Sequence, residues 1–246
     1  MDPAYYVAAG SLKARSFQLD TVSNNLANSA TVGYKPEKSF FAVFNKAVND
    51  GSGLPLSGFL NDGTVLASRG TDFSQGTLKT TGRNMDLALE GSGFFLVQTP
   101  SGVQATRDGR FGLSKTGELQ TLDGAQVLGK NGQPIRLDVN DPAFTVLGDG
   151  TVMQGPEARG QIDIRDYANL DALQRMGSNR FDPAGTPAKA ATATVVQGSL
   201  EQSSVDMATC MIDMIRLNRL FEMSMKVAST ITNDMDSRSI SDVAPR

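Results

Sequence analysis

Two long segments at opposite ends of the chain constrain the fold most, because both are patterned as helices. The C-terminal one, residues 206–236, contains no Gly or Pro. Its apolar residues form stripes over most of the circumference, whereas a helix on the surface of a monomer needs a single stripe about 100° wide. We therefore expect this helix to be surrounded, either at the centre of its own domain or among copies of itself.

The N-terminal segment predicts a helix that carries a heptad seam. Asp2 suits the N-cap and Pro3 the first helical position. Apolar residues follow at alternating steps of three and four, and Arg15 is the one break. We predict that an assembly interface uses the seam residues Tyr5, Leu12, Leu19, Val22 and Leu26. The predicted C-terminal half of this interface is Met207, Met211, Met214, Phe221, Met225 and Ala228.

Methionine is concentrated in the C-terminal segment, which holds six of the ten in the chain. Methionine adapts its shape and suits a surface that packs against non-identical neighbours. It is also simply a good helix former, so both explanations of the enrichment remain open.

Between the two ends the pattern changes to short β-type runs separated by turn dipeptides, which is typical of an all-β domain. Residues 94–97 are the clearest core strand. Further strands are predicted at 103–106, 119–122, 127–128 and 161–164, and a short helix at 170–176.

Ser203 and Ser204 are candidate N-caps of the last helix. The expected organisation of the chain has four parts. The parts are an N-terminal helix and turn (1–36), an extended arm or hairpin (37–75), a β domain (76–198) and a C-terminal helix (199–246). The predicted fold class is mixed and mainly β: a central all-β domain flanked by N- and C-terminal α-helices that pair as a coiled coil.

Composition excludes several kinds of chemistry. The chain has no His and a single Cys, so Ser-His-Asp sites, His-based metal sites and CxxC zinc clusters cannot form. We assign no catalytic, cofactor-binding or metal residues and expect no cofactor. Cys210 is expected to fill space on a helix face, and an inter-subunit disulfide is the alternative.

Charge and hydropathy also limit the partners. A net charge of −3 and a pI near 5.1 argue against a nucleic-acid partner. No apolar run of about 18 residues exists, so we expect no membrane span. The first residues lack the basic and apolar regions of a cleaved signal peptide. We expect a cytosolic protein or one that is exported without such a signal.

Two other functional classes stay open from the residues. A glycan hydrolase needs only two carboxylates, and Asp86, Glu90, Asp108 and Glu118 are candidates, although Asp108 and Glu118 lie at turns. A secreted adhesin could use the β domain for binding and the helices as an oligomerisation stalk.

Particular residues resemble a known family. Residues 24–35, which we call the signature turn, read NNLANSATVGYK and are similar to the signature of the bacterial flagellar rod and hook family. The similarity continues through nearly the whole chain in blocks at 75–78, 81–82, 87–89, 91–95, 106–111, 127–129 and 198–206. Within the family, the length and the short segment 40–74 favour the proximal rod type, with the distal rod type as the nearest alternative.

The resemblance implies a structural subunit of the flagellar basal body, a rod protein within the periplasm that serves motility. Such subunits are exported through the flagellar type III apparatus and assemble with further copies and with other rod proteins. Their terminal helices form a coiled coil and stack as the inner tube of the rod, while the β domain faces outward. The implied turn residues are Asn24, Asn25, Asn28, Thr31, Gly33 and Tyr34. The asparagines would cap and pin the turn, and ordinary solvated asparagines at a helix end are the alternative.

Overall fold

The computed structural model describes residues 3–45, 61–139, 143–183 and 185–243, and only the backbone of 3–8, 40–45, 61–69 and 234–243. The chain divides into two compact units. The helical unit comprises Met1–Ala27, Glu37–Gly70 and Asp206–Arg246, and the β unit comprises Asn28–Pro36 and Thr71–Val205. This division places residues 28–36, here called loop 28–36, with the β unit rather than with the first helix.

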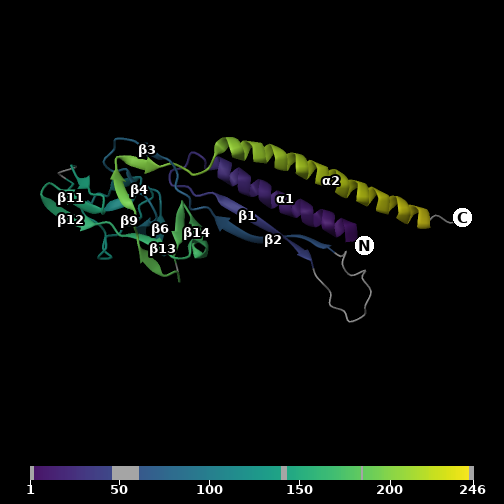
Figure 1. Cartoon of the computed structure of the whole chain (residues 1–246), viewed down its shortest axis with the longest axis horizontal. Helices are drawn as coiled ribbons and strands as arrows, with labels where there is room; N and C mark the ends of the chain where they lie inside the picture. The colour runs from purple at the N-terminus through teal and green to yellow at the C-terminus, as the bar shows by residue number, and fades with distance from the viewer. Residues whose placement is uncertain (1–2, 46–60, 140–142, 184, 244–246) are drawn as a thin grey trace. The chain divides into compact units, whose positions relative to one another are not determined.

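The helical unit is built on two helices that pack along one another. Helix α1 (Pro3–Ala27) and helix α2 (Met207–Val243) run side by side in opposite directions (Figure 1). Neither helix is long and apolar enough, in its described residues, to cross a membrane. The start of α2 corrects one expectation. Asp206, rather than Ser203 or Ser204, caps the helix, because its carboxylate accepts hydrogen bonds from Ala208 N and Thr209 Oγ1.

A two-stranded sheet completes the helical unit. Its strands are β1 (Glu37–Asn45) and β2 (Asn61–Thr71), and β1 lies against α1. The Asn25 side-chain amide exchanges two hydrogen bonds with the Glu37 backbone, at 2.8 and 2.9 Å. Thr21 Oγ1 lies 2.8 Å from Ser39 Oγ. One side of α1 is therefore occupied within the subunit itself.

The β unit contains one large sheet and several small ones. The nine-stranded sheet follows the order β14-β15-β6-β5-β9-β8-β7, with β13 paired to β5 and β16 paired to β13. Its strands are β5 (Phe94–Thr99), β6 (Gly102–Thr106), β7 (Phe111–Leu113), β8 (Leu119–Thr121), β9 (Gln126–Val127), β13 (Ile164–Tyr167), β14 (Gln174–Gly177), β15 (Arg180–Asp182) and β16 (Ala188–Ala190).

The remaining strands form three small antiparallel sheets. One contains β10 (Thr145–Val146), β11 (Thr151–Gln154) and β12 (Glu157–Gln161). A second pairs β4 (Leu87–Glu90) with β17 (Thr194–Gln197), and a third pairs β3 (Leu78–Thr80) with β18 (Ser199–Glu201). Strand β18 is the last element of the β unit before α2 begins.

Strand β5 is buried on both faces, as its uninterrupted apolar run predicts. Phe95 and Val97 pack into one core cluster with residues of β4, β7 and β8. Phe94 and Leu96 pack on the opposite side with residues such as Phe181. The mainly β fold with a helix at each end is therefore as predicted.

Two local predictions are wrong. Residues 161–164 are not one strand, because β12 ends at Gln161 and β13 begins at Ile164 in a different sheet. Residues 170–176 are not an α-helix. A single 3-10 turn (Leu170–Ala172) is followed by β14, which pairs with β15. Hairpin pairing with β15 therefore outweighs the local helical pattern.

A backbone contact in the β unit gives a test of this fold. A Cβ atom at Gly109 would lie 1.6 Å from Leu87 O, whereas one at Gly112 would meet nothing within 4 Å. We expect Gly109→Ala to lower the free energy of unfolding by about 3 kcal/mol and Gly112→Ala by about 0.5 kcal/mol or less. Urea unfolding followed by circular dichroism measures both. Equal effects would contradict the close approach of the β6–β7 connection to β4.

Candidate functional site

Loop 28–36 folds as consecutive tight turns behind α1. Thr31 N donates to Asn28 O at 3.1 Å, and Tyr34 N donates to Thr31 O at 3.3 Å. The Thr31 hydroxyl donates to Asn28 Oδ1 at 3.2 Å. Asn28 therefore stabilises the loop with both its backbone and its side chain.

Gly33 is required in this loop for two reasons. Its φ of +67° lies in the left-handed region that favours glycine. A Cβ atom at this position would also lie 2.6 Å from the backbone carbonyl carbon of Arg107. The close approach lets Gly33 N donate to Glu201 O at 2.8 Å. The loop is thereby bonded to β18, near the other end of the chain.

A buried carboxylate, that of Glu201, lies at the centre of the site. Its Oε1 accepts from Lys35 Nζ at 2.5 Å and from Gly76 N at 2.9 Å. Its Oε2 accepts from Arg107 Nη1 at 2.9 Å. We call Glu201 and these three donors the Glu201 cluster. The side chains of Lys35, Arg107 and Glu201 are 1%, 5% and 1% exposed, so water cannot replace these bonds.

The second hydrogen bonds of the two cations extend the cluster into the β unit. Lys35 Nζ also donates to Ser74 O at 2.6 Å. Arg107 Nη2 donates to Gly91 O at 2.7 Å, and its guanidinium lies 5.3 Å from the centre of the Phe94 ring. Each cation therefore binds the carboxylate on one side and a backbone carbonyl on the other.

Electrostatics make Glu201 the member on which the cluster depends most. Burial lowers the pKa of the Lys35 ammonium group, the Glu201 carboxylate opposes that effect, and the Arg107 cation adds to it. Breaking a buried ion pair by removing one partner leaves an uncompensated charge. Loss of Glu201 would leave two such cations, so this side chain is the member on which the other two depend.

The β14–β15 hairpin holds the other side of the loop. Arg175 Nη2 donates to Lys35 O, and its guanidinium lies over the Tyr34 ring at 5.0 Å. Asn179 Nδ2 donates to Val32 O at 2.9 Å. Ser178 and Asn179 have φ of 48° and 55°, as a two-residue type I′ hairpin requires. The hairpin thus supplies two side-chain donors to two carbonyls of the loop.

The predicted turn residues fall into different environments. Gly33 and Tyr34 are buried in the β unit, and Asn28 and Thr31 bond each other. Asn25 is buried on α1 and bonds Glu37, while Asn24 is exposed. Sequence reasoning missed Arg107, Arg175 and Glu201 as partners of the turn. Arg107 and Glu201 lie in the blocks 106–111 and 198–206, which resemble the family. That resemblance was the available signal for these two residues.

The predicted assembly residues divide into covered and uncovered sets. Leu12, Leu19, Val22 and Leu26 on α1 are half-buried, as are Met214, Phe221 and Ala228 on α2. Met207, Met211 and Met225 are 47%, 47% and 50% exposed. The side chain of Tyr5 lies outside the described residues. The first set is partly covered within the subunit, and the second is open to other molecules.

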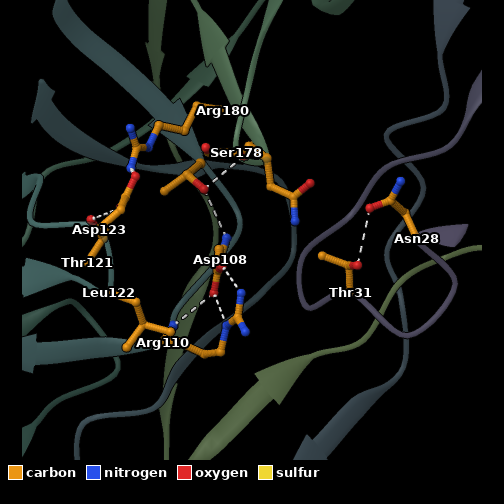
Figure 2. A pocket seen from close by; sticks show the side chains of 11 residues that line it. Asn28, Thr31, Asp108, Arg110, Thr121, Leu122, Asp123, Ser178 and Arg180 are labelled. Carbon is orange, nitrogen blue, oxygen red and sulfur yellow. Dashed lines mark hydrogen bonds and ion pairs between the residues drawn. The ribbon is translucent and has the colours of Figure 1, made fainter. Parts of the chain in front are cut away.

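A polar pocket of about 330 Å³ lies beside loop 28–36, between the β6–β7, β8–β9 and β14–β15 connections (Figure 2). Its four charged side chains form two ion pairs. Arg110 binds Asp108 through two hydrogen bonds of 2.9 and 2.6 Å, and Arg180 binds Asp123. Burial alone would raise the pKa of Asp123, but Thr121 and Arg180 lower it below its usual value. These charges stabilise connections between strands.

The four candidate carboxylates do not form a pair suited to glycan cleavage. Asp86 is buried and accepts from the Thr81 hydroxyl, Asp108 binds Arg110, and Glu90 is exposed. The hydrogen bond from Arg136 lowers the pKa of Glu118. A general acid in such an enzyme needs a raised pKa instead.

The Glu201 cluster predicts large effects of charge removal. We expect Glu201→Gln to lower the free energy of unfolding of the β unit by about 3–5 kcal/mol, since it leaves two buried cations without their carboxylate. Lys35→Met should cost less, about 1–3 kcal/mol, since Glu201 loses one charged hydrogen bond but keeps Arg107. The matched controls Glu90→Gln and Lys79→Met change exposed residues and are expected to cost about 0.5 kcal/mol or less. If the four variants unfold at the same urea concentration, the cluster does not stabilise the unit.

A comparison of Gly33 with Gly82 separates the cost of a left-handed backbone from the cost of a steric clash. Gly82 has a similar φ of +74°, but a Cβ atom there would meet nothing within 4 Å. Gly82→Ala is expected to cost about 1–2 kcal/mol, the price of a left-handed alanine. Gly33→Ala should cost at least about 2 kcal/mol more, because the Arg107 backbone must move. Similar losses in the two variants would contradict the tight docking of the loop.

Comparison with known proteins supports the family resemblance along the chain. Residues 6–35 match the flagella basal body rod protein family. Residues 88–154 match the flagellar hook protein FlgE/F/G D1 domain, and residues 196–241 match the flagellar basal body rod FlgEFG protein C-terminal family.

Two kinds of relative are similar over most of their length. The flagellar basal-body rod protein FlgG of Bacillus subtilis (strain 168) is 32% identical over 249 residues, which cover 92% of this chain and 93% of the relative. The flagellar basal-body rod protein FlgF of Mesorhizobium japonicum is 31% identical over 225 residues, 90% of each chain. FlgF of Caulobacter vibrioides is 34% identical over 227 residues, also 90% of each. The chain therefore belongs to the flagellar basal-body rod protein family.

Proposed function

We propose that this chain is a structural subunit of the flagellar rod that polymerises through α1 and α2. The observation that carries the proposal is the exposed apolar surface of α2 in a family of rod proteins. The family is one of structural proteins and not of enzymes. Its members belong to the flagellar basal body, and assembly with other rod proteins follows from that membership.

The apolar surface of α2 is too large for one partner helix. Its exposed large apolar side chains, between 47% and 66% accessible, are Met207, Met211, Ile212, Ile215, Met223, Met225 and Val227. An exposed apolar area of this kind indicates an interaction surface. Helices of neighbouring subunits are the proposed cover, and the adaptable methionines suit contacts that differ slightly from copy to copy.

The spacing of half-buried residues supports a coiled coil between α1 and α2. Of the nine half-buried residues among the described side chains of α2, seven recur at steps of four and three, at Cys210, Met214, Leu217, Phe221, Ser224, Ala228 and Ile231, and the other two, Asp213 and Leu220, flank this line. This is the spacing of a heptad seam. We infer that this seam packs on the α1 residues Leu12, Leu19, Val22 and Leu26, which leaves the rest of α2 for other copies.

In the proposed rod, the paired helices stack as the inner tube around the export channel, and the β unit faces outward. The subunit reaches the periplasm through the flagellar type III apparatus. Torque passes from copy to copy through repeated interfaces. Heterologous contacts that do not close into a ring generate a helical filament, which agrees with this role.

The position along the rod is proposed as proximal, on the short segment 40–74. Relatives named FlgF and relatives named FlgG are both similar at about 30% identity. Mass spectrometry of basal bodies purified from strains blocked at successive assembly stages tests the position. A proximal subunit is present in rods that lack the distal rod protein, and a distal subunit is absent from them.

The exposed stripe of α2 gives a test of polymerisation. Met211→Asp places a charge on a surface that is open in the subunit, so the unfolding free energy of the isolated chain should change by about 0.5 kcal/mol or less. Basal bodies should lack the variant and motility in soft agar should be lost. The control Ser229→Asp adds the same charge at another exposed position of α2. This variant should still assemble, which would show that the loss in the Met211 variant comes from its place in the interface and not from the added charge alone. Normal motility of the Met211 variant would contradict the proposed polymerisation surface.

A further inference from the structure

The chain passes between its two units at four places, after Ala27, Pro36, Gly70 and Val205. On the β-unit side, the segments that make these passages are bonded to one another. Asp72 N donates to Pro36 O at 2.8 Å, and Lys35 Nζ donates to Ser74 O at 2.6 Å. These two bonds join loop 28–36 to the segment that follows β2.

The last passage, which leads into α2, is bonded to the same loop. Gly33 N donates to Glu201 O at 2.8 Å, and Ser204 N donates to Tyr34 O at 3.4 Å. The segment before α2 also packs closely on Gly76, where an added Cβ atom would lie 2.0 Å from Gln202 O. All four connections to the helical unit therefore begin from one hydrogen-bonded group of residues.

Glu201 links this group to the core of the large sheet. Its carboxylate and backbone oxygens together accept from Gly33, Lys35, Gly76 and Arg107. Arg107 then contacts Gly91 O and the ring of Phe94, which is 2% exposed within β5. A continuous set of hydrogen bonds, which ends in the contact of Arg107 with the Phe94 ring, runs from the segments of the four connections to the central strand β5.

We propose that the Glu201 cluster is the force-transmitting joint of the subunit, the place where load on either helix enters the β unit. Buried hydrogen bonds between charged groups resist extension because water cannot exchange with them. The mechanical role rests on the proposed rod function, since only a rod places the subunit under torque. The strength of the joint is a property of the single chain and can be measured separately.

Single-molecule pulling on the full chain distinguishes a joint from an ordinary stabilising cluster. In a Cys210→Ser background, handles at Ser23→Cys and Asn131→Cys load the chain from α1 to the turn that follows β9 in the β unit. Handles at Lys115→Cys and Asn131→Cys load the β unit alone. Ser23, Lys115 and Asn131 are exposed.

We expect Glu201→Gln to shorten the lifetime before the first rupture by about tenfold or more when load enters from α1, since a charged hydrogen bond contributes about 1.5–3 kcal/mol. The lifetime should shorten by a clearly smaller factor when the β unit is pulled alone, because the directly loaded segment, residues 115–131, then lies outside the Glu201 cluster and the variant acts only through the lower stability of the whole unit. Equal shortening in both geometries, or none from α1, overturns the proposal. Arg107→Lys, which retains the positive charge but not the two-sided contact, gives the same comparison if the Glu201 variant does not fold.

Cells test the mechanical role in the rod. The measured quantity is the medium viscosity at which swimming speed falls to half. This viscosity should be lower for strains with either variant than for the parent strain. A variant that weakens the joint in pulling but swims like the parent at every viscosity overturns the mechanical role and leaves the rod function intact. If purified basal bodies lack the unmodified chain, the rod function is contradicted. The pulling experiment would then still show whether the Glu201 cluster is mechanically strong in the single chain.

Discussion

The burial of one carboxylate organises the β unit. A carboxylate that is 1% exposed must be compensated by cations and donors, and Glu201 obtains them from positions 35, 76 and 107. Lys35 and Glu201 are 166 residues apart in the chain. This interaction therefore brings the residues behind the first helix together with the residues in front of the last one, and both helices leave the β unit from neighbouring segments.

The helical unit has the opposite character, because its apolar surface is only partly covered. Residues of α2 at heptad spacing are half-buried, while methionines and isoleucines on the other sides are exposed. A subunit of this kind gains hydrophobic free energy on assembly, at about 25 cal/mol for each Å² of apolar surface removed from water. Among the described residues, seven exposed large apolar side chains gather on α2 alone, whereas the five in the β unit are spread over separate strands and connections, which favours polymerisation through the helices.

The sequence predicts the features that depend on local pattern. The terminal helices, strand β5 and the turn at Gly33 follow from periodicity, an apolar run and glycine chemistry. Features set by distant partners could not be predicted. Residues 174–177 read as helical in isolation and become a strand because the hairpin that they form with β15 joins the large sheet, where β15 pairs with the distant strand β6. The partnership of Lys35 with Glu201 leaves no trace in a single sequence, because neither residue has a local pattern that names the other.

A buried ion cluster at this place is not in itself needed for the stability of the β unit. Well-packed apolar residues of similar volume often stabilise a protein as much as a buried ion pair does. They would, however, allow the connecting segments to slide, since hydrophobic contacts have no direction. The bonds of Glu201 to Lys35, Gly76 and Arg107 fix both the distance and the orientation of those segments. In the proposed rod, load would enter the β unit through these segments, and three directional polar contacts would hold the segments in place where a single apolar contact would let them slide.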